Sequence, residues 1–336
     1  MGVTYRHPAP PLDAYIASLW HRDGPAPYPH LIVLPRPTLH LMINLGDAYH
    51  AYQLGEFGSG ADDDGADGGS PGATCNASWV AGVWDRAHVM AWPRELRILS
   101  VIFRPGGAAP FLRLPLAELR NQLVPLDAIW GSAAAEISER LGAQPTPQAR
   151  LALLERLLLA RLARSDHAAS ERTLWDDPWL ATVQQAVAAI ARTHGKLLID
   201  ALSAQLGLSH KHLITQFQRL VGTTPKALAR LYRLRYLLRS LEPGSDLGRT
   251  SGLDRDLDPG RLRVQPLTCT QIAHQAGYFD EAHFNKDFRA FTGLTPGAYL
   301  RTVRQAHTEH PEYGPPSPLQ PTGGSGEGGR RQPSCK

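Results

Sequence analysis

The sequence has few cysteines, no long hydrophobic run and no secretory pattern, and each absence narrows what the protein can be. Its three cysteines, Cys75, Cys269 and Cys335, are spaced too widely for a zinc site or a disulfide framework. Apolar runs such as residues 96–103 are far shorter than the roughly 18 to 20 residues that cross a bilayer. The N-terminus lacks a charged segment followed by an apolar one. We therefore expect a cytoplasmic protein without a membrane span.

Excess positive charge is absent from the first half of the chain. Residues 1–176 carry 15 Lys and Arg against 18 Asp and Glu, whereas residues 177–304 carry 17 against 10, a balance of +7. Lys and Arg that neutralise phosphates release condensed counterions, so a basic region favours nucleic-acid binding. Arg-rich helices are also common as ordinary solvated surfaces, so charge alone does not decide between the two interpretations.

The first hundred residues have the patterning of short strands. Apolar residues alternate with polar or small ones, and Pro, Gly or Asp separates the segments. The pattern predicts strands at residues 31–34, 38–45, 48–54, 78–84, 86–92 and 96–103. Such strands build a small antiparallel sandwich or barrel. Residues 56–72, acidic and rich in glycine, are predicted to form a disordered loop.

Helical periodicity replaces the strand pattern after residue 104. Apolar residues recur at steps of three and four, which predicts helices at residues 115–121, 126–141 and 148–164. The third is apolar over much of its circumference, so it either packs on the strands alone or also supplies a homodimer seam. We expect one β-rich sensor or oligomerisation domain over residues 1–164, followed by a polar linker at 165–177.

The last third of the chain contains one pattern twice, at residues 202–225 and 272–296. Each copy has an apolar helix, a glycine turn, a second helix and a Gly-x-Thr-Pro stop. This is the pattern of a helix-turn-helix, and two copies would place two reading helices on one DNA duplex. An expected helix at 226–241 would set their separation, for which about 34 Å matches one turn of DNA.

The first copy predicts a reading helix that begins after Ser209. Gly207 supplies the turn and Ser209 caps the helix. Leu213 and Phe217, four residues apart, are predicted to face the core. The outer face, near the N-terminal end that reaches base edges, then consists of His210, Lys211, Ile214 and Thr215.

The second copy follows the same plan with Gly277 at the turn and Asp280 as the cap. Phe284 and Phe288 are predicted to face the core. A glutamate can accept a hydrogen bond from cytosine and an asparagine can pair with adenine. The predicted reading face contains such groups and consists of Glu281, His283, Asn285 and Lys286.

These motifs resemble the DNA-binding domain of the AraC/XylS family of bacterial transcription regulators over residues 178–303. The resemblance implies an all-helical domain of two helix-turn-helix units joined by a long helix, with double-stranded DNA and RNA polymerase as partners. It implies that the first unit contacts DNA through Lys211, Ile214 and Thr215. It implies that the second unit does so through Glu281, Ala282, Asn285 and Lys286. The connection at residues 243–266 is longer than is usual in that family, and we expect it to loop out.

The N-terminal half resembles an uncharacterised group of sensor-like domains found ahead of this module. The similarity lies in residues 101–107, 115–119 and 124–130. It implies that the domain receives a signal, such as a small-molecule effector, or forms a homodimer. The expected fold is α+β and multidomain, with a β-rich sandwich or barrel-like domain, an all-α domain of two helix-turn-helix units, and a disordered tail at 304–336.

A ligand- or metal-binding β-barrel enzyme with an accessory helical region is the alternative. Its metal site would need histidines at the spacing of barrel metal centres, which is missing from His30, His40, His50 and His88. Cys75 is the single cysteine of the N-terminal half, so that half holds no cysteine cluster for DNA-repair chemistry. We therefore expect no enzyme activity and no metal or other cofactor.

Two further features of the N-terminal half have a structural and a functional interpretation. Arg104-Pro105-Gly106-Gly107 is either a tight turn or an anion site before a helix. The aromatic residues, at strand spacing, either fill the core or line a ligand pocket: Trp79, Trp84, Trp92, Phe103 and Trp130.

Overall fold

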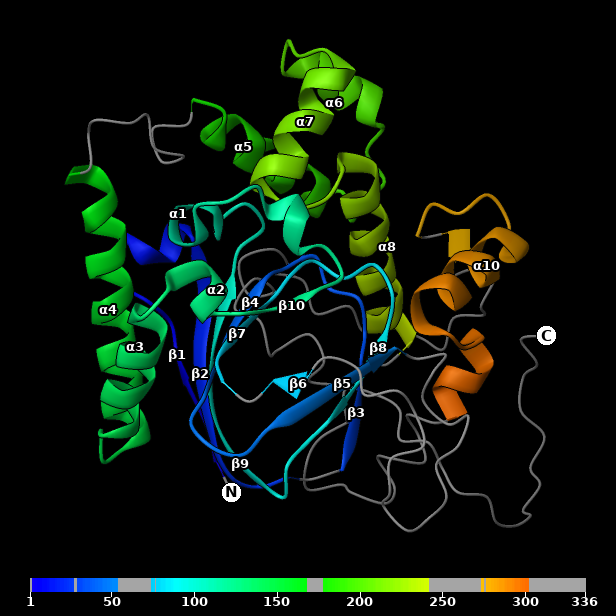
Figure 1. Ribbon diagram of the computed structural model, residues 1–336. Coiled ribbons are helices and arrows are strands. Elements are labelled where there is room, and N and C mark those ends of the chain that lie inside the picture. Colours follow the sequence, from blue (N-terminus) through cyan, green and yellow to red (C-terminus); the bar gives the residue numbers. More distant parts are fainter. Residues whose placement is uncertain are drawn as a thin grey trace, which may run out of the picture.

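The structure is a computed structural model, shown in Figure 1. It describes residues 2–26, 29–53, 74–75, 77–167, 178–241, 273–274 and 276–301. Three predictions therefore fall outside the described residues: the disordered loop at 56–72, the looped-out insertion at 243–266 and the disordered tail at 304–336. Among the described helices, none is long and apolar enough to cross a membrane.

Two antiparallel sheets form the N-terminal domain, which confirms the predicted β-rich fold (Figure 1). The larger sheet has the order β1 (Gly2–Arg6), β2 (Ile16–Pro25), β9 (Glu95–Phe103), β4 (His40–Asn44), β7 (Trp79–Ala81) and β10 (Leu123–Pro125). The smaller sheet has the order β3 (His30–Val33), β8 (His88–Ala91), β5 (Tyr49–Gln53) and β6 (Thr74–Cys75). All six predicted strands are present, and β1, β2, β6 and β10 were not predicted.

The unpredicted strand β2 is an interior strand of the larger sheet, next to the edge strand β1. It pairs with β1 on one side and with β9 on the other, from Ile16 opposite Phe103 to Pro25 opposite Glu95. Its sequence ends in Gly24-Pro25, which is typical of a turn, and its first four residues are all buried instead of alternating. A strand whose two faces are both buried needs no alternating pattern, so the sequence offers little signal.

The helices of the N-terminal domain are more broken than the sequence predicted. The prediction of one helix over 126–141 was wrong, because Gly131, with φ at 60°, separates α2 (Asp127–Trp130) from α3 (Ala133–Gly142). The predicted helix at 115–121 is the short 3-10 helix η2 (Leu116–Leu119), which follows α1 (Ala109–Leu112). The 148–164 prediction is confirmed by α4 (Pro147–His167), which continues three residues into the expected linker.

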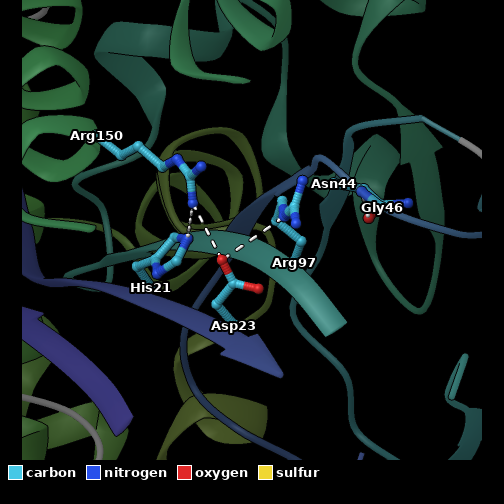
Figure 2. Close-up of polar contacts among 6 residues, drawn as sticks. All are labelled: His21, Asp23, Asn44, Gly46, Arg97 and Arg150. Atoms are coloured by element: carbon cyan, nitrogen blue, oxygen red, sulfur yellow. Dashed lines mark hydrogen bonds and ion pairs between the residues drawn. The ribbon is translucent and has the colours of Figure 1, made fainter. Parts of the chain in front are cut away.

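Helix α4 packs on the strand domain through an apolar face and a buried polar cluster. Leu151, Leu154 and Leu158 are each 1% exposed. Arg150, itself buried, donates from Nη1 to His21 Nε2 at 3.0 Å and lies 3.3 Å from Asp23, as Figure 2 shows. Burial and the nearby Arg150 charge lower the pKa of His21, so its ring is neutral and can accept this bond. The cluster joins α4 to β2.

The helices of the C-terminal half whose bounds the structure gives are α5 (Leu180–Arg192), α6 (Ile199–Gln205), α7 (His210–Leu220), α8 (Pro225–Leu241) and α10 (Glu281–Thr292) (Figure 1). Helix α5 has Trp179 at its N-cap position.

One hydrophobic core extends from the sheets into these helices. Leu41, Phe103 and Leu116 of the N-terminal domain belong to the same cluster as Phe217 and Phe288 of the C-terminal helices, and all five are fully buried. Burying apolar side chains of this size contributes roughly 1.5 to 3 kcal/mol each. The two halves of the chain are therefore packed together as one body.

Candidate nucleic-acid interface

The first helix-turn-helix unit has the turn and cap that its sequence predicted. Gly207 adopts a φ of 65°, and the Ser209 side chain accepts a hydrogen bond from the His212 amide at 3.2 Å. The Ser203 hydroxyl donates to the Leu208 carbonyl at 2.6 Å and closes the turn from inside. These bonds fix the direction in which α7 leaves α6.

Helix α7 separates its two faces as predicted. Leu213, Phe217 and Leu220 are completely buried. Its predicted reading residues lie on the other face, with His210, Lys211 and Thr215 exposed and Ile214 half-buried. The Thr215 hydroxyl donates to the Lys211 carbonyl at 3.0 Å, so this hydroxyl is engaged within the helix. No acidic residue lies within α7, which leaves its outer face basic.

The second unit repeats this design around α10. Gly277 turns with a φ of 80°, and the Asp280 side chain accepts from the His283 amide at 2.7 Å. Phe284 and Phe288 are completely buried, with ring centroids 5.7 Å apart. Ala282, His283 and Lys286 are exposed, while Glu281 and Asn285 are half-buried.

A polar cluster joins α10 to the linking helix α8. Arg230 donates from Nη2 to Asp287 Oδ1 at 2.7 Å and from Nε to Oδ2 at 3.3 Å. The Tyr278 hydroxyl donates to the same carboxylate at 3.4 Å, and Arg233 lies over the Tyr278 ring at 5.5 Å. Burial and the neighbouring Asp287 charge raise the pKa of Tyr278, so its hydroxyl stays a neutral donor. This cluster sets how α10 lies relative to α8.

Both units also contact the N-terminal domain directly. The Ala87 amide, between β7 and β8, donates to the Phe291 carbonyl at the end of α10 at 2.9 Å. At Gly222, after α7, a side-chain Cβ would lie 2.8 Å from the Leu116 carbonyl of η2. The N-terminal domain therefore supports both reading helices at their C-terminal ends, away from the predicted reading residues.

Sequence reasoning missed Asp287 and Phe279. Asp287 lies on the buried face of α10, three residues after Phe284. An acidic residue on the buried face of a helix indicates that its charge is paired with a basic residue. Phe279, directly before the α10 cap, is 86% exposed and is one of the few large apolar side chains left in solvent among the described residues. A strongly exposed aromatic side chain beside the reading face is a candidate contact for a partner.

The residues of the alternative, enzymatic interpretation are not gathered into a site. In the part of the chain that the structure describes, no group of three His, Cys, Asp or Glu side chains could hold a metal ion. Burial and nearby arginines lower the pKa of His40 and His88 to about 3, which keeps both rings neutral. Trp79, Phe103 and Trp130 are core residues.

The run at residues 104–107 forms a tight turn rather than the start of a long helix. The Arg104 Nε donates to the Asp13 carbonyl at 2.7 Å, and a Cβ at Gly107 would overlap the Tyr15 carbonyl at 2.1 Å. The close approach of Tyr15 explains the glycine at residue 107.

Family models match two separate parts of the chain. Residues 263–301 match the family of bacterial regulatory helix-turn-helix proteins, AraC family, and residues 4–125 match a domain of unknown function, DUF6597. No curated protein matches the chain.

Similar solved structures include three of ToxT from Vibrio cholerae. Apo ToxT from strain SCE256 is 12% identical, with 84% of this chain and 97% of that chain covered and a TM-score of 0.39. A second ToxT structure is 9% identical, covering 90% and 98%, with a TM-score of 0.39. ToxT bound to an unsaturated fatty acid is 11% identical, covering 89% and 94%, with a TM-score of 0.37.

Proposed function

We propose that the protein is a DNA-binding transcription regulator similar to the AraC family, and that it reads two successive major-groove segments of one duplex, with α7 and then α10. One observation carries the proposal: each helix buries its apolar face in a common core and leaves polar side chains in solvent at its N-terminal end. The polar cluster of Arg230, Asp287 and Tyr278 supports a fixed spacing of the two helices.

The proposed DNA-facing residues divide by their chemistry. In the first unit, Lys211 reaches a phosphate or guanine, while Ile214 and the Thr215 methyl meet thymine methyl groups. In the second unit, Glu281 accepts from cytosine and Asn285 pairs with adenine. The remaining proposed contacts are His210, Ala282, His283 and Lys286.

We further infer that the N-terminal domain, residues 1–164, modulates this reading. The shared core and the bond from Ala87 to Phe291 support the inference, because a change in the sheet domain would be transmitted to α10. The same proposal includes a small-molecule effector and a homodimer interface on α4. It also includes RNA polymerase as a partner and a cytoplasmic location. The DNA-binding domain spans residues 178–303, joined to the first by a linker at 165–177, with the 243–266 insertion looping out.

Footprinting on selected DNA tests the two-segment reading. The full-length protein would select duplexes from a random pool, and hydroxyl-radical footprinting would then map protection on them. We expect two protected segments about 10 base pairs apart, centre to centre. The double variant Lys211→Ala with Lys286→Ala should bind more weakly in fluorescence anisotropy, and its salt dependence should fall by about two units of slope.

Arg140→Ala provides the matched control, because it removes an exposed cation from α3, where Arg140 pairs with Glu136. This variant should bind like the wild type. A single protected segment, or a double variant that binds as tightly as Arg140→Ala, would contradict the proposal.

A further inference from the structure

In the first unit, one residue separates the turn glycine from the helix cap. The Gly207 amide donates to the Ala204 carbonyl at 3.1 Å. The Leu208 amide donates to the Ser203 carbonyl, also at 3.1 Å. Leu208 packs against the hydrophobic core, and Ser209 then caps α7. Each residue of this turn therefore serves the fold, through a positive φ, apolar packing or a cap.

In the second unit, two residues occupy the same interval, and Phe279 is the additional one. The turn glycine again donates to the carbonyl three residues before it, at 2.9 Å. The Tyr278 amide donates to the Ala273 carbonyl at 3.0 Å, so Tyr278 corresponds to Leu208 in the bonding of the turn. Tyr278 is 3% exposed and supplies the packing, while Asp280 supplies the cap. Phe279 lies between them, and neither the packing nor the cap needs its ring.

The Phe279 ring is left in solvent at the end of α10 that would enter the major groove. It is 86% exposed, although the transfer of an aromatic ring out of water is favourable. Phe279 directly precedes Asp280, so its Cα lies about 3.8 Å from that of the cap. The N-terminal residues of a recognition helix are those that contact base edges. A duplex read by α10 would therefore lie against this ring.

Positive charge lies beside the turn that carries Phe279. The Lys196 Cγ would lie 3.4 Å from a Cβ at Gly277, and the Arg233 guanidinium lies over the Tyr278 ring at 5.5 Å. In a duplex, phosphates flank the base edges, so cations beside an apolar ring match its surface. They match the centre of a protein interface less well, because charged residues are depleted there. The surroundings of the ring therefore favour DNA as its partner.

We propose that the Phe279 ring packs against the C5-methyl group of a thymine in the second major-groove segment, and that the protein prefers thymine there for this reason. The inference deepens the proposed function and rests on it. Thymine presents its methyl group in the major groove, and phenylalanine is one of the side chains that contact it. Because an aromatic ring neutralises no phosphate, this contact adds sequence preference without adding salt dependence.

Removal of single methyl groups from the DNA tests the contact. The full-length protein is titrated in fluorescence anisotropy with a duplex selected from a random pool. Each thymine of the second protected segment is replaced in turn by deoxyuridine, which keeps the base pairing and lacks only the C5-methyl group. We expect one replacement to weaken wild-type binding by about fourfold, the loss that corresponds to one buried methyl group.

Two variants of Phe279 connect that methyl group to the ring. Phe279→Ala should bind the thymine duplex about tenfold more weakly, with an unchanged salt slope, and should bind the deoxyuridine duplex equally well. Phe279→Leu keeps an apolar side chain and should bind within about threefold of the wild type. Because the ring is 86% exposed, neither variant should unfold the protein.

Tyr5→Ala is the matched control, because Tyr5, on β1 of the N-terminal domain, is also an exposed aromatic residue, at 49%. It removes an aromatic ring of similar size from a surface remote in sequence from the reading helices. This variant should bind selected DNA as the wild type does, and it should keep the fourfold response to the missing methyl group.

Three outcomes would overturn the proposal. Equal DNA affinity of Phe279→Ala and the wild type would mean that the ring serves another partner, such as a protein surface. If Phe279→Ala responded to each missing methyl group as the wild type does, the ring would not contact a thymine methyl. A second segment without a methyl-sensitive thymine would remove the preference itself. In each case the protein still binds DNA and the proposed function stands, whereas a wild type that selected no DNA would refute the function and the contact together.

Discussion

The two helix-turn-helix units share a design but are held in place by different forces. Helix α7 is fixed by fully buried apolar residues and by close backbone packing of Gly222 against Leu116 of η2. Helix α10 also has an apolar face, but its position relative to α8 depends on the Arg230–Asp287 pair and the Tyr278 hydroxyl. The first unit is therefore positioned mainly by shape, and the second mainly by polar contacts that charge changes can disrupt.

The largest expected effect comes from breaking the apolar attachment of the first unit. Phe217→Ala removes a fully buried ring from the core that both halves share, and should lower the free energy of unfolding by about 3 to 5 kcal/mol. Because the core is continuous, tryptophan fluorescence from the sheets and helical circular dichroism should report one shared, shifted transition in urea.

Gln218→Ala is the matched control on the same helix, since Gln218 is exposed. Its effect should stay within about 0.5 kcal/mol. If Phe217→Ala unfolded the helices while the sheets kept the wild-type midpoint, the two halves would not share a cooperative core.

Breaking the polar attachment of the second unit should lower the free energy of unfolding less than Phe217→Ala does, and its effect should be concentrated in α10. Asp287→Asn keeps the shape of the side chain and removes its charge, which leaves Arg230 without a carboxylate. We expect a loss of about 2 kcal/mol, less than for a fully buried pair because the Arg230 side chain is 37% exposed. Hydrogen exchange should quicken in α10 more than in α7.

Asp200→Asn in the first unit provides the comparison, because Asp200 is 91% exposed and lies 3.5 Å from His210. It should change neither stability nor exchange measurably. Equal acceleration of exchange in α7 and α10 by Asp287→Asn would show that the second unit has no separate polar attachment.

The two reading faces should differ in what they contribute to binding. Lys211→Ala, on a helix without acidic residues, should weaken binding to every duplex by about tenfold and lower the salt slope by about one. Asn285→Ala should instead reduce the preference for one base pair, by about 1 to 3 kcal/mol, on a helix that also carries Glu281. Anisotropy on a panel of single-base-pair variants distinguishes the two. A uniform loss from Asn285→Ala would remove the proposed division between affinity and specificity.

The sequence predicted the two units better than it predicted how they are held. Caps, turns and inward faces depend on residues within one helical turn of each other, so Ser209, Asp280 and Gly277 could be interpreted locally. The pair of Arg230 with Asp287 joins residues 57 positions apart, and no local pattern reveals it. The same limit applies to the contact between Ala87 and Phe291.

In the N-terminal domain, the local sequence pattern also explains which secondary-structure predictions were confirmed and which were wrong. Strands with alternating burial, such as β4, were predicted, whereas β2, buried along its first half, was not. The helix predicted over 126–141 was wrong because Gly131 adopts a positive φ that helical periodicity does not detect.

The smallest expected difference between the units lies in their helix caps. Ser209 accepts from the His212 amide at 3.2 Å, whereas the Asp280 carboxylate accepts from the His283 amide at 2.7 Å. Replacing either residue with alanine should cost about 1 kcal/mol, and Asp280→Ala should cost a few tenths more, because a carboxylate also interacts with the helix dipole. Salt screens that added term, so in urea titrations the two losses should converge at about 1 M salt. Ser132→Ala is the control, because Ser132 occupies the N-cap position of α3 without a side-chain cap bond. It should leave stability unchanged, and a loss there as large as at Ser209 would mean that the cap hydrogen bonds do not stabilise the reading helices.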